Sequence, residues 1–148
     1  MNSTAARRSK LKLYVTAAIV SLLGLADAIY LTVQHVTGQS VLCTIVAGCS
    51  EVLSSQYAVV AGVPLALVGA AAYFSVFSLA TLAAFGYRIA GSLLTPLVLL
   101  MFLFSLWLIY LQGFVIGAWC QFCLLSAAVT TTLTIIALLA RRTLARLS

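Results

Sequence analysis

The stretch from Leu93 to Leu111, LLTPLVLLMFLFSLWLIYL, contains no charged side chain and decides the fold class of this chain. A bilayer core of roughly 30 Å is crossed by about 20 apolar residues in an α-helix, so this stretch is long enough to span a membrane. Residues 13–36, 63–85 and 119–140 have a similar length and apolar character. The whole chain is 64% hydrophobic and only 7% charged, too little polar surface for a water-soluble globule. We therefore predict an all-α, polytopic membrane four-helix bundle that forms one domain over residues 1–148.

The connections between the four predicted spans differ in length. Gly86–Arg88 and Gln112–Gly117 form short links, whereas residues 37–62 form one long loop. The end of this loop, Gly62-Val63-Pro64, places a proline where a helix begins. The sequence contains no internal repeat or low-complexity tract, so function is expected to come from the bundle and the long loop.

The basic residues predict how the chain is oriented in the membrane. The net charge is +6, and the eight Lys and Arg residues precede the first span, lie at Arg88, or follow the fourth span. By the positive-inside rule both termini are cytoplasmic, and the long loop and the Gln112–Gly117 link lie outside. An alternative is a cleaved signal peptide ending near Ala26-Asp27-Ala28, which would leave the later loops on the same side. The basic residues form no patch with stacking aromatics, so no nucleic acid partner is expected.

All four cysteines then face the outer compartment. Cys43 and Cys49 lie in the long loop, and Cys120 and Cys123 form a CxxC motif at the outer end of the last span. An even number of cysteines in a disulfide-permissive compartment indicates thiol-disulfide chemistry.

Three other interpretations of the cysteines remain open. They could be small apolar side chains, could form two structural disulfides, or could supply four thiolates to zinc or copper. The loop offers only His35 and Glu51 as nearby further ligands, so no metal is expected.

The CxxC spacing favours electron transfer. Residues three apart on a helix lie on one face about 5 to 6 Å apart, which suits a disulfide that opens and closes. Cys120 is expected in the first helical turn, where the positive end of the helix dipole favours a thiolate. Cys123 lies one turn deeper, where a lipid-soluble oxidant could reach it from the membrane while a protein thiol reaches Cys120.

The loop is expected to complement this pair. Gly48 gives the backbone enough freedom for Cys43 and Cys49 to bridge. From Ser50 to Tyr57 the pattern predicts a short capping helix across the outer mouth of the bundle. Such a helix would shield an apolar pocket and hold Cys49 near Cys120.

These motifs resemble one known family, the vitamin K epoxide reductase homologues. The resemblance is carried by Cys43, by Cys49–Tyr57 (CSEVLSSQY), by Gly62-Val63-Pro64 leading through Gly69 to Tyr73, and by Cys120-Gln-Phe-Cys123. DsbB, another four-helix disulfide generator, carries its CxxC in the first outer loop, so its order of cysteine pairs is the reverse. The resemblance covers nearly the whole chain.

The resemblance implies a membrane thiol oxidoreductase of the bacterial inner membrane that passes electrons to a quinone, ubiquinone or menaquinone. Cys43 would exchange with a separate thioredoxin-like, DsbA-like protein in the outer compartment. Cys49 would form a transient disulfide with Cys120, and Cys123 would attack or form a charge-transfer contact with the quinone. Each transfer is thiolate attack on a disulfide and follows the reduction potentials. The alternative function is a non-catalytic metal-binding or redox-sensing membrane module.

Other residues carry weaker expectations. The resemblance implies that Ser55, and with it Tyr57, lies at the quinone, although Ser55 equally suits a local backbone cap. Leu124–Ala127 lacks the tyrosine of the animal enzymes, which favours a plain quinone over vitamin K epoxide. Asp27 is an acid inside a span and is a possible proton relay, with helix packing as the alternative. His35 is expected to anchor the helix at the interface, and an outer aromatic belt is expected from Trp107, Tyr110 and Trp119.

Overall fold

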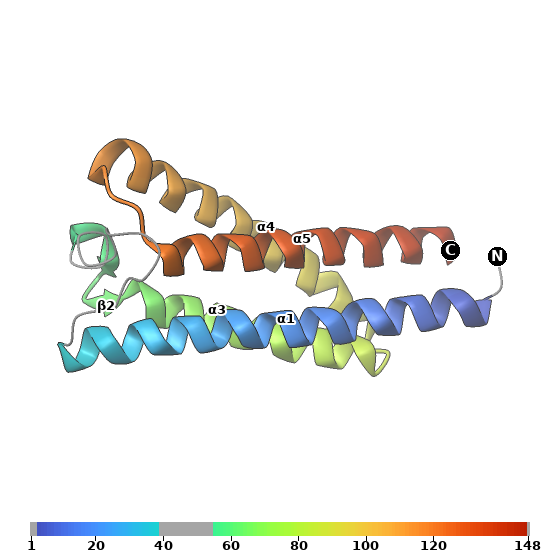
Figure 1. Ribbon diagram of the computed structural model, residues 1–148. Coiled ribbons are helices and arrows are strands. Elements are labelled where there is room, and N and C mark those ends of the chain that lie inside the picture. Colours follow the sequence, from blue (N-terminus) through green and yellow to red (C-terminus); the bar gives the residue numbers. More distant parts are fainter. Residues whose placement is uncertain (1–2, 39–54, 148) are drawn as a thin grey trace.

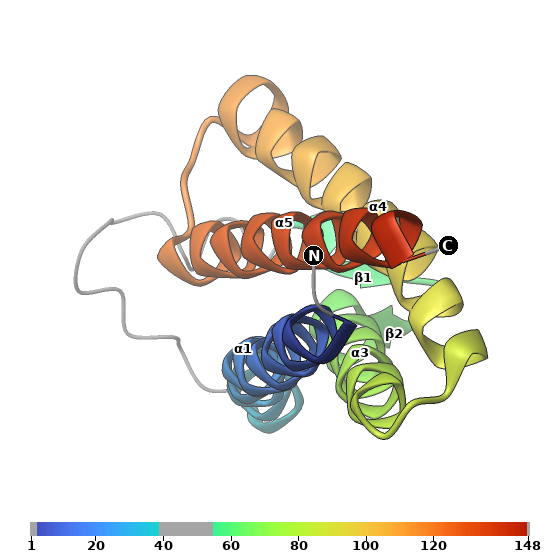
Figure 2. The same ribbon diagram turned by 90° about the vertical axis from the view of Figure 1, so that its right-hand side faces the viewer.

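The computed structural model of the chain describes residues 3–38 and 55–147. Within these ranges it contains four long helices: α1 (Ser3–Thr37), α3 (Leu65–Ala84), α4 (Arg88–Tyr110) and α5 (Gln121–Leu147). Each is long and apolar enough to cross a membrane. Figures 1 and 2 show them as one bundle, with both termini at the same end. The predicted all-α class with four spans is confirmed.

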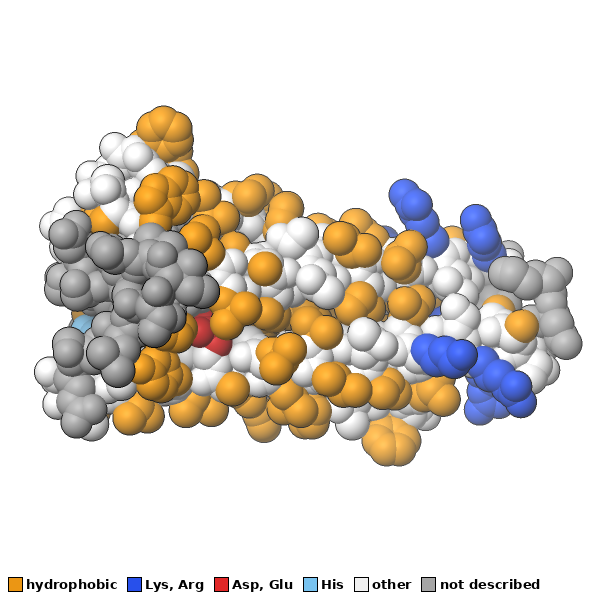
Figure 3. Space-filling view, in the orientation of Figure 1, with side chains coloured by type: hydrophobic (Ala, Val, Ile, Leu, Met, Phe, Trp, Pro, Cys, Tyr) orange, Lys and Arg blue, Asp and Glu red, His pale blue; other side chains and the backbone are white. Residues whose placement is uncertain are grey.

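Three of the helices extend beyond the apolar windows that predicted them. α1 begins at Ser3 rather than near residue 13, α4 begins at Arg88 rather than Leu93, and α5 continues to Leu147. An apolar window gives the length of chain that can lie in the hydrocarbon core of the membrane. The helix itself can extend further, because Lys and Arg are good helix formers and continue its backbone hydrogen bonds. The extra turns carry the basic residues, and Figure 3 shows the Lys and Arg side chains gathered at the end of the bundle where the termini lie.

The helices pack mainly through alanine, valine and leucine side chains. α1 contacts α3 and α5, and α4 contacts the same two helices. Val76 and Ala80 of α3 are fully buried, and Leu94 of α4 and Leu133 of α5 are 1% exposed. Alanines at the contacts allow close backbone approach, which drives helix association where lipid removes the hydrophobic effect. Large apolar side chains such as Leu23 and Leu100 point outward, as suits a lipid-facing surface.

A small hairpin precedes α3 and was not predicted. The 3-10 helix η1 (Gln56–Ala58) leads into strand β1 (Val59–Val60), which pairs antiparallel with β2 (Val63–Pro64). The turn residues Ala61 and Gly62 have φ of 53° and 82°, and a two-residue type I′ turn requires positive φ at both positions. Of the predicted capping helix, residues 50–54 lie outside the described ranges. The described part is a single 3-10 turn at Gln56–Ala58.

The link between α4 and α5 also differs from the prediction. Residues 112–117 were expected to be a short link between two helices, but the helix continues without a break as a π-helix, η2 (Leu111–Ile116). It ends at Gly117, whose φ of 72° lies in the left-handed region that favours glycine. π-helical turns are rare and are frequent at functional sites. The extension brings Gln112 into the protein interior, where it is 2% exposed.

Candidate functional site

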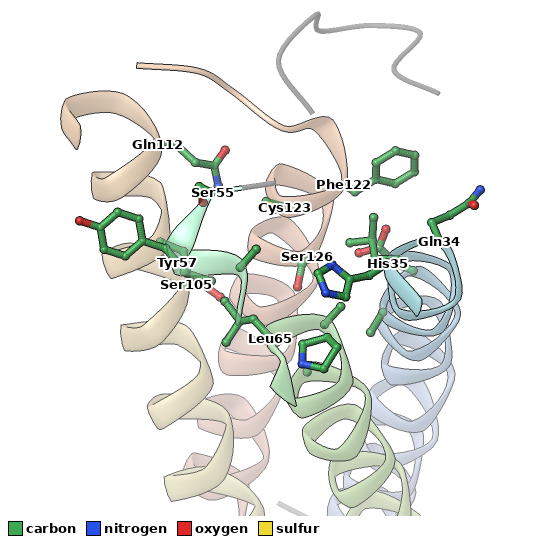
Figure 4. A pocket seen from close by; sticks show the side chains of 18 of the residues that line it. Gln34, His35, Ser55, Tyr57, Leu65, Ser105, Gln112, Phe122, Cys123 and Ser126 are labelled. Atoms are coloured by element: carbon green, nitrogen blue, oxygen red, sulfur yellow. The ribbon is translucent and has the colours of Figure 1, made fainter. Parts of the chain in front are cut away.

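A cavity of about 440 Å³ lies at the end of the bundle opposite the termini. Its volume falls in the range of small-molecule sites, about 300 to 1,000 Å³. Figure 4 shows its polar side chains coming from several elements: His35 from α1, Ser55 and Tyr57 from the segment around η1, Ser105 from α4, Gln112 from η2, and Cys123 and Ser126 from α5. Apolar residues complete the wall, among them Leu31, Leu65, Leu108 and Ile116.

The floor of the cavity is built around Tyr73 of α3. Its hydroxyl contacts Ser126 Oγ at 2.6 Å and donates to the Ser126 carbonyl at 3.1 Å. The ring lies against Gly24 of α1, where a Cβ atom would come within 2.3 Å of it. One turn further along α3, Val76 is fully buried in the core. Tyr73 therefore joins α1, α3 and α5 at the depth where the cavity ends.

Asp27 lies in the wall of the same cavity, on α1. Its side chain is 8% exposed, and its Oδ1 atom has no hydrogen-bond partner. Leaving a buried polar atom unpaired costs about 1 to 3 kcal/mol, so native structures rarely keep one without a reason. A ligand that hydrogen-bonds Oδ1 inside the cavity would remove this cost.

The CxxC motif lies at the start of α5. Cys120 is fully buried and immediately precedes the helix, one residue outside the first turn where it was expected. Cys123 lies in the first turn, is partly buried and lines the cavity. Both carry free thiols, which are hydrogen-bonded to each other. The two sulfurs therefore have different surroundings, and Cys123 is the one that faces the cavity.

The start of α5 also affects the acidity of Cys120, which precedes the membrane-spanning part of the helix. The hydrogen bond from the Cys123 thiol, together with the backbone N–H groups of Cys123 and Phe122, lowers the pKa of Cys120 to about 7. Burial and the charge of Asp27 act in the opposite direction but are weaker than these bonds in sum. The lowered pKa increases the fraction of Cys120 that is a thiolate near neutral pH, and the thiolate is the reactive form in disulfide exchange.

Gln112 holds the segment that leads to Cys120. Its side-chain Oε1 accepts a hydrogen bond from the backbone N–H of Cys120 at 3.0 Å. Its backbone carbonyl accepts the N–H groups of Gly117 and Ala118. The sequence interpretation missed this residue, since Gln112 was assigned only to a link. Its position at the end of a long apolar stretch could have indicated a role, because an amide side chain that is buried there requires hydrogen-bond partners.

The structure brings most of the predicted site residues to one place. The residues that line the cavity are Asp27, Ser55, Tyr57 and Cys123. Cys120 does not line it but is hydrogen-bonded to the Cys123 thiol, which does. His35, predicted as an interfacial anchor, lines it as well. The sequence interpretation also missed the Tyr73–Ser126 bond, which requires knowing that the two helices are neighbours.

Part of the predicted site stays a prediction. Cys43 and Cys49 lie outside the described residues, so their pairing with each other and with Cys120 is not tested. Within residues 3–38 and 55–147, no three His, Cys, Asp or Glu side chains gather into a metal-binding group.

Comparison with known proteins agrees with this geometry. Residues 15–138 match the vitamin K epoxide reductase family, and the chain belongs to that family. This confirms the resemblance found in its motifs. Together with the four helices that can cross a membrane, family membership makes the chain a multi-pass membrane protein.

One curated relative is the protein named thiol-disulfide oxidoreductase LTO1 from Arabidopsis thaliana. It is 50% identical over 48 residues, which are 32% of this chain and 13% of that protein. The match therefore spans only a small part of the relative's length.

Proposed function

We propose that this protein is a membrane thiol oxidoreductase that oxidises a thioredoxin-like, DsbA-type partner and passes the electrons to a quinone. The observation that carries the proposal is the position of Cys123, which is hydrogen-bonded to a second thiol and lines a cavity of ligand size. Membership of the vitamin K epoxide reductase family and the short match to a thiol-disulfide oxidoreductase support it.

The cavity suits a quinone ring. Its wall is largely apolar, and hydrogen-bonding groups of Ser55, Tyr57 and Asp27 are distributed around it. The unpaired Oδ1 of Asp27 is suited to a hydrogen bond with a ring oxygen when the carboxyl is protonated. A bound quinone, ubiquinone or menaquinone, would supply an acceptor for two electrons and two protons.

The four cysteines would carry the electrons in three balanced steps. The partner's dithiol reduces the Cys43–Cys49 disulfide, and two electrons and two protons move from the partner to the loop. Cys49 then attacks Cys120 of the Cys120–Cys123 disulfide and releases Cys123 as a thiolate. Cys43 next attacks Cys49 of this mixed disulfide, which restores the Cys43–Cys49 disulfide and displaces Cys120 as a thiolate. A low pKa makes Cys120 a good leaving group in this displacement. The resulting Cys120–Cys123 dithiol gives its two electrons and two protons to the quinone and becomes a disulfide again.

The proposed orientation places this site on the outer face of the bacterial inner membrane, with both termini in the cytoplasm. The gathering of Lys and Arg at the end with the termini supports it, because that end then faces the cytoplasm (Figure 3). The cavity lies at the other end, where a partner in the outer compartment could reach the loop.

The purified protein in detergent is expected to reduce a soluble ubiquinone or menaquinone analogue when a reduced DsbA-type protein is supplied. One quinol should form for each disulfide made in the donor, measured by quinone absorbance and by thiol counting. Binding of zinc or copper by the cysteines without any quinone reduction would favour the metal-binding alternative.

In a bacterium lacking its own membrane disulfide oxidase, expression of this protein should restore disulfide formation outside the cytoplasm. Activity in detergent without this rescue would contradict the proposed orientation or partner.

Asp27 is proposed to pass a proton to the reduced quinone. The change Asp27→Asn keeps the size of the side chain and removes its acidic proton, so we expect quinol formation to slow about 10- to 100-fold. Reduction of the Cys43–Cys49 disulfide by the donor should continue at its original rate, because this step involves neither the quinone nor Cys120, whose pKa depends on the Asp27 charge. Stopped-flow measurement of the two steps separates them. Unchanged quinol formation in this variant would assign Asp27 to helix packing instead.

A further inference from the structure

The segment between η2 and α5 is held by one residue, Gln112, through its backbone carbonyl and its side-chain amide oxygen. Residues 117–120 have no helix or strand of their own. Three of their four backbone N–H groups, those of Gly117, Ala118 and Cys120, bond to Gln112. Gln112 is 2% exposed, so these bonds lie in the protein interior. One residue therefore determines where the backbone of Cys120 lies.

The π-helix explains how Gln112 reaches this segment. An α-helical turn would bring residue 116 to the Gln112 carbonyl, whereas the wider π turn brings Gly117 there. Gly117 then reverses the chain with its left-handed φ, and the indole of Trp119 packs against Gly113, where a Cβ would lie 3.3 Å from the ring. The chain consequently turns back over η2, and the N–H of Cys120 comes within 3.0 Å of Gln112 Oε1.

The position of the Cys120 backbone matters because its sulfur acts as the N-terminal cap of α5. The Cys120 carbonyl accepts the first backbone hydrogen bond of the helix, from Leu124 N–H at 3.0 Å. The Cys120 sulfur accepts hydrogen bonds from the backbone N–H groups of Phe122 and Cys123. Such bonds are sensitive to the direction of the side chain, which follows from the backbone. A Cys120 backbone without its anchor would turn the sulfur away from these donors and from the Cys123 thiol.

We propose that Gln112 is a positioning residue for the redox pair, which holds Cys120 so that its sulfur lies at the helix N-terminus in contact with the Cys123 thiol. The proposal deepens the proposed function, because it concerns the same cysteines. The evidence for it is the hydrogen bond, the burial and the π-helical geometry, all independent of the quinone and the donor.

The test is the titration of the Cys120 thiol in Gln112→Leu. Leucine keeps the bulk of the side chain and removes the acceptor, so the pKa of Cys120 should rise from about 7 by about one pH unit toward its ordinary value of 9.0. The thiolate fraction at pH 7 then falls about fivefold. The measurement is the ultraviolet absorbance of the thiolate against pH, taken as the difference between the reduced protein and its Cys120→Ser form. Among the described residues, the titratable groups acting on Cys120 are Cys123 of α5 and Asp27 of α1, and every variant keeps both.

A matched control separates positioning from loss of stability. Leu94→Ala removes a buried side chain of α4 far from the cysteines, so the protein should unfold at a lower temperature with the pKa of Cys120 unchanged. If Gln112→Leu does not fold, Gln112→Asn is measured instead. Asparagine keeps an amide, but its side chain is one methylene shorter, so its oxygen does not reach the N–H of Cys120. An unchanged pKa in a folded Gln112 variant overturns the proposal. The titration uses neither quinone nor donor. If the protein proved not to reduce a quinone, the titration would still show whether Gln112 positions Cys120.

Discussion

Replacing Cys123 by alanine is expected to lower quinone reduction by the purified protein by at least about a thousandfold. Of the two cysteines described, Cys123 lines the cavity, and in the proposed relay its thiol is half of the pair that closes to a disulfide when electrons leave. Without it Cys120 has no neighbour on α5 with which to form that disulfide. The rate is measured as loss of quinone absorbance with a reduced DsbA-type donor.

The same variant should retain the earlier half of the reaction. The Cys120 thiolate can still attack Cys49 of the Cys43–Cys49 disulfide and release Cys43. Because no Cys123 is present to resolve the product, a Cys49–Cys120 mixed disulfide should accumulate, visible by non-reducing electrophoresis and peptide mass spectrometry. Leu125→Ala is a suitable control, because this side chain lies two residues away on the same helix and is 49% exposed outside the cavity. Its activity should equal that of the unchanged protein. Quinone reduction that persists in Cys123→Ala would falsify the relay.

Replacing Gly24 by alanine should destabilise the bundle by about 1 to 3 kcal/mol. In an ordinary helix this change stabilises by up to about 1 kcal/mol, because alanine loses less backbone freedom than glycine. At Gly24 the new Cβ would lie 2.3 Å from the ring of Tyr73, which is 2% exposed and tied to Ser126. The ring cannot move aside without breaking that bond, so α1 and α3 must separate.

A second glycine provides the comparison. At Gly69 of α3 an added Cβ would meet only the Ala28 side chain at 3.9 Å, an ordinary contact. Gly69→Ala should therefore leave the thermal unfolding midpoint in detergent unchanged or slightly higher, while Gly24→Ala lowers it by several degrees. Equal midpoints for the two variants would mean that the contact between Gly24 and Tyr73 is not tight.

The fold was predictable because hydropathy alone defines membrane spans. Apolar stretches of bilayer length identified all four helices, and Asp27 is the one Asp, Glu, Lys or Arg residue within them, since a charged residue inside the hydrocarbon core is costly. Helix ends were less predictable. Ser3–Lys12 and Arg141–Leu147 are helical although they contain basic residues, because apolar length and backbone hydrogen bonding are separate properties.

The part of the candidate site that could be predicted consists of residues whose type or spacing is unusual in an apolar chain. The CxxC motif, Asp27 and Ser55 are conspicuous in an apolar chain, and four of the site residues named from sequence line one cavity: Asp27, Ser55, Tyr57 and Cys123. Gln112 and Tyr73 were not assigned roles because each acts on a residue from another element. Their roles follow from the π-helix and from the contact between α3 and α5, which no local pattern records.

The contact of Tyr73 with both α1 and α5 limits how this protein could be redesigned. Enlarging the cavity for a bulkier substrate would most simply mean trimming its floor, yet the floor is the same ring that fills the space over Gly24 and bonds Ser126. A smaller side chain there would leave a void between α1 and α3 and an unpaired hydroxyl one turn below Cys123. The size of the cavity and the stability of the fold therefore both depend on Tyr73, and a change made for one affects the other.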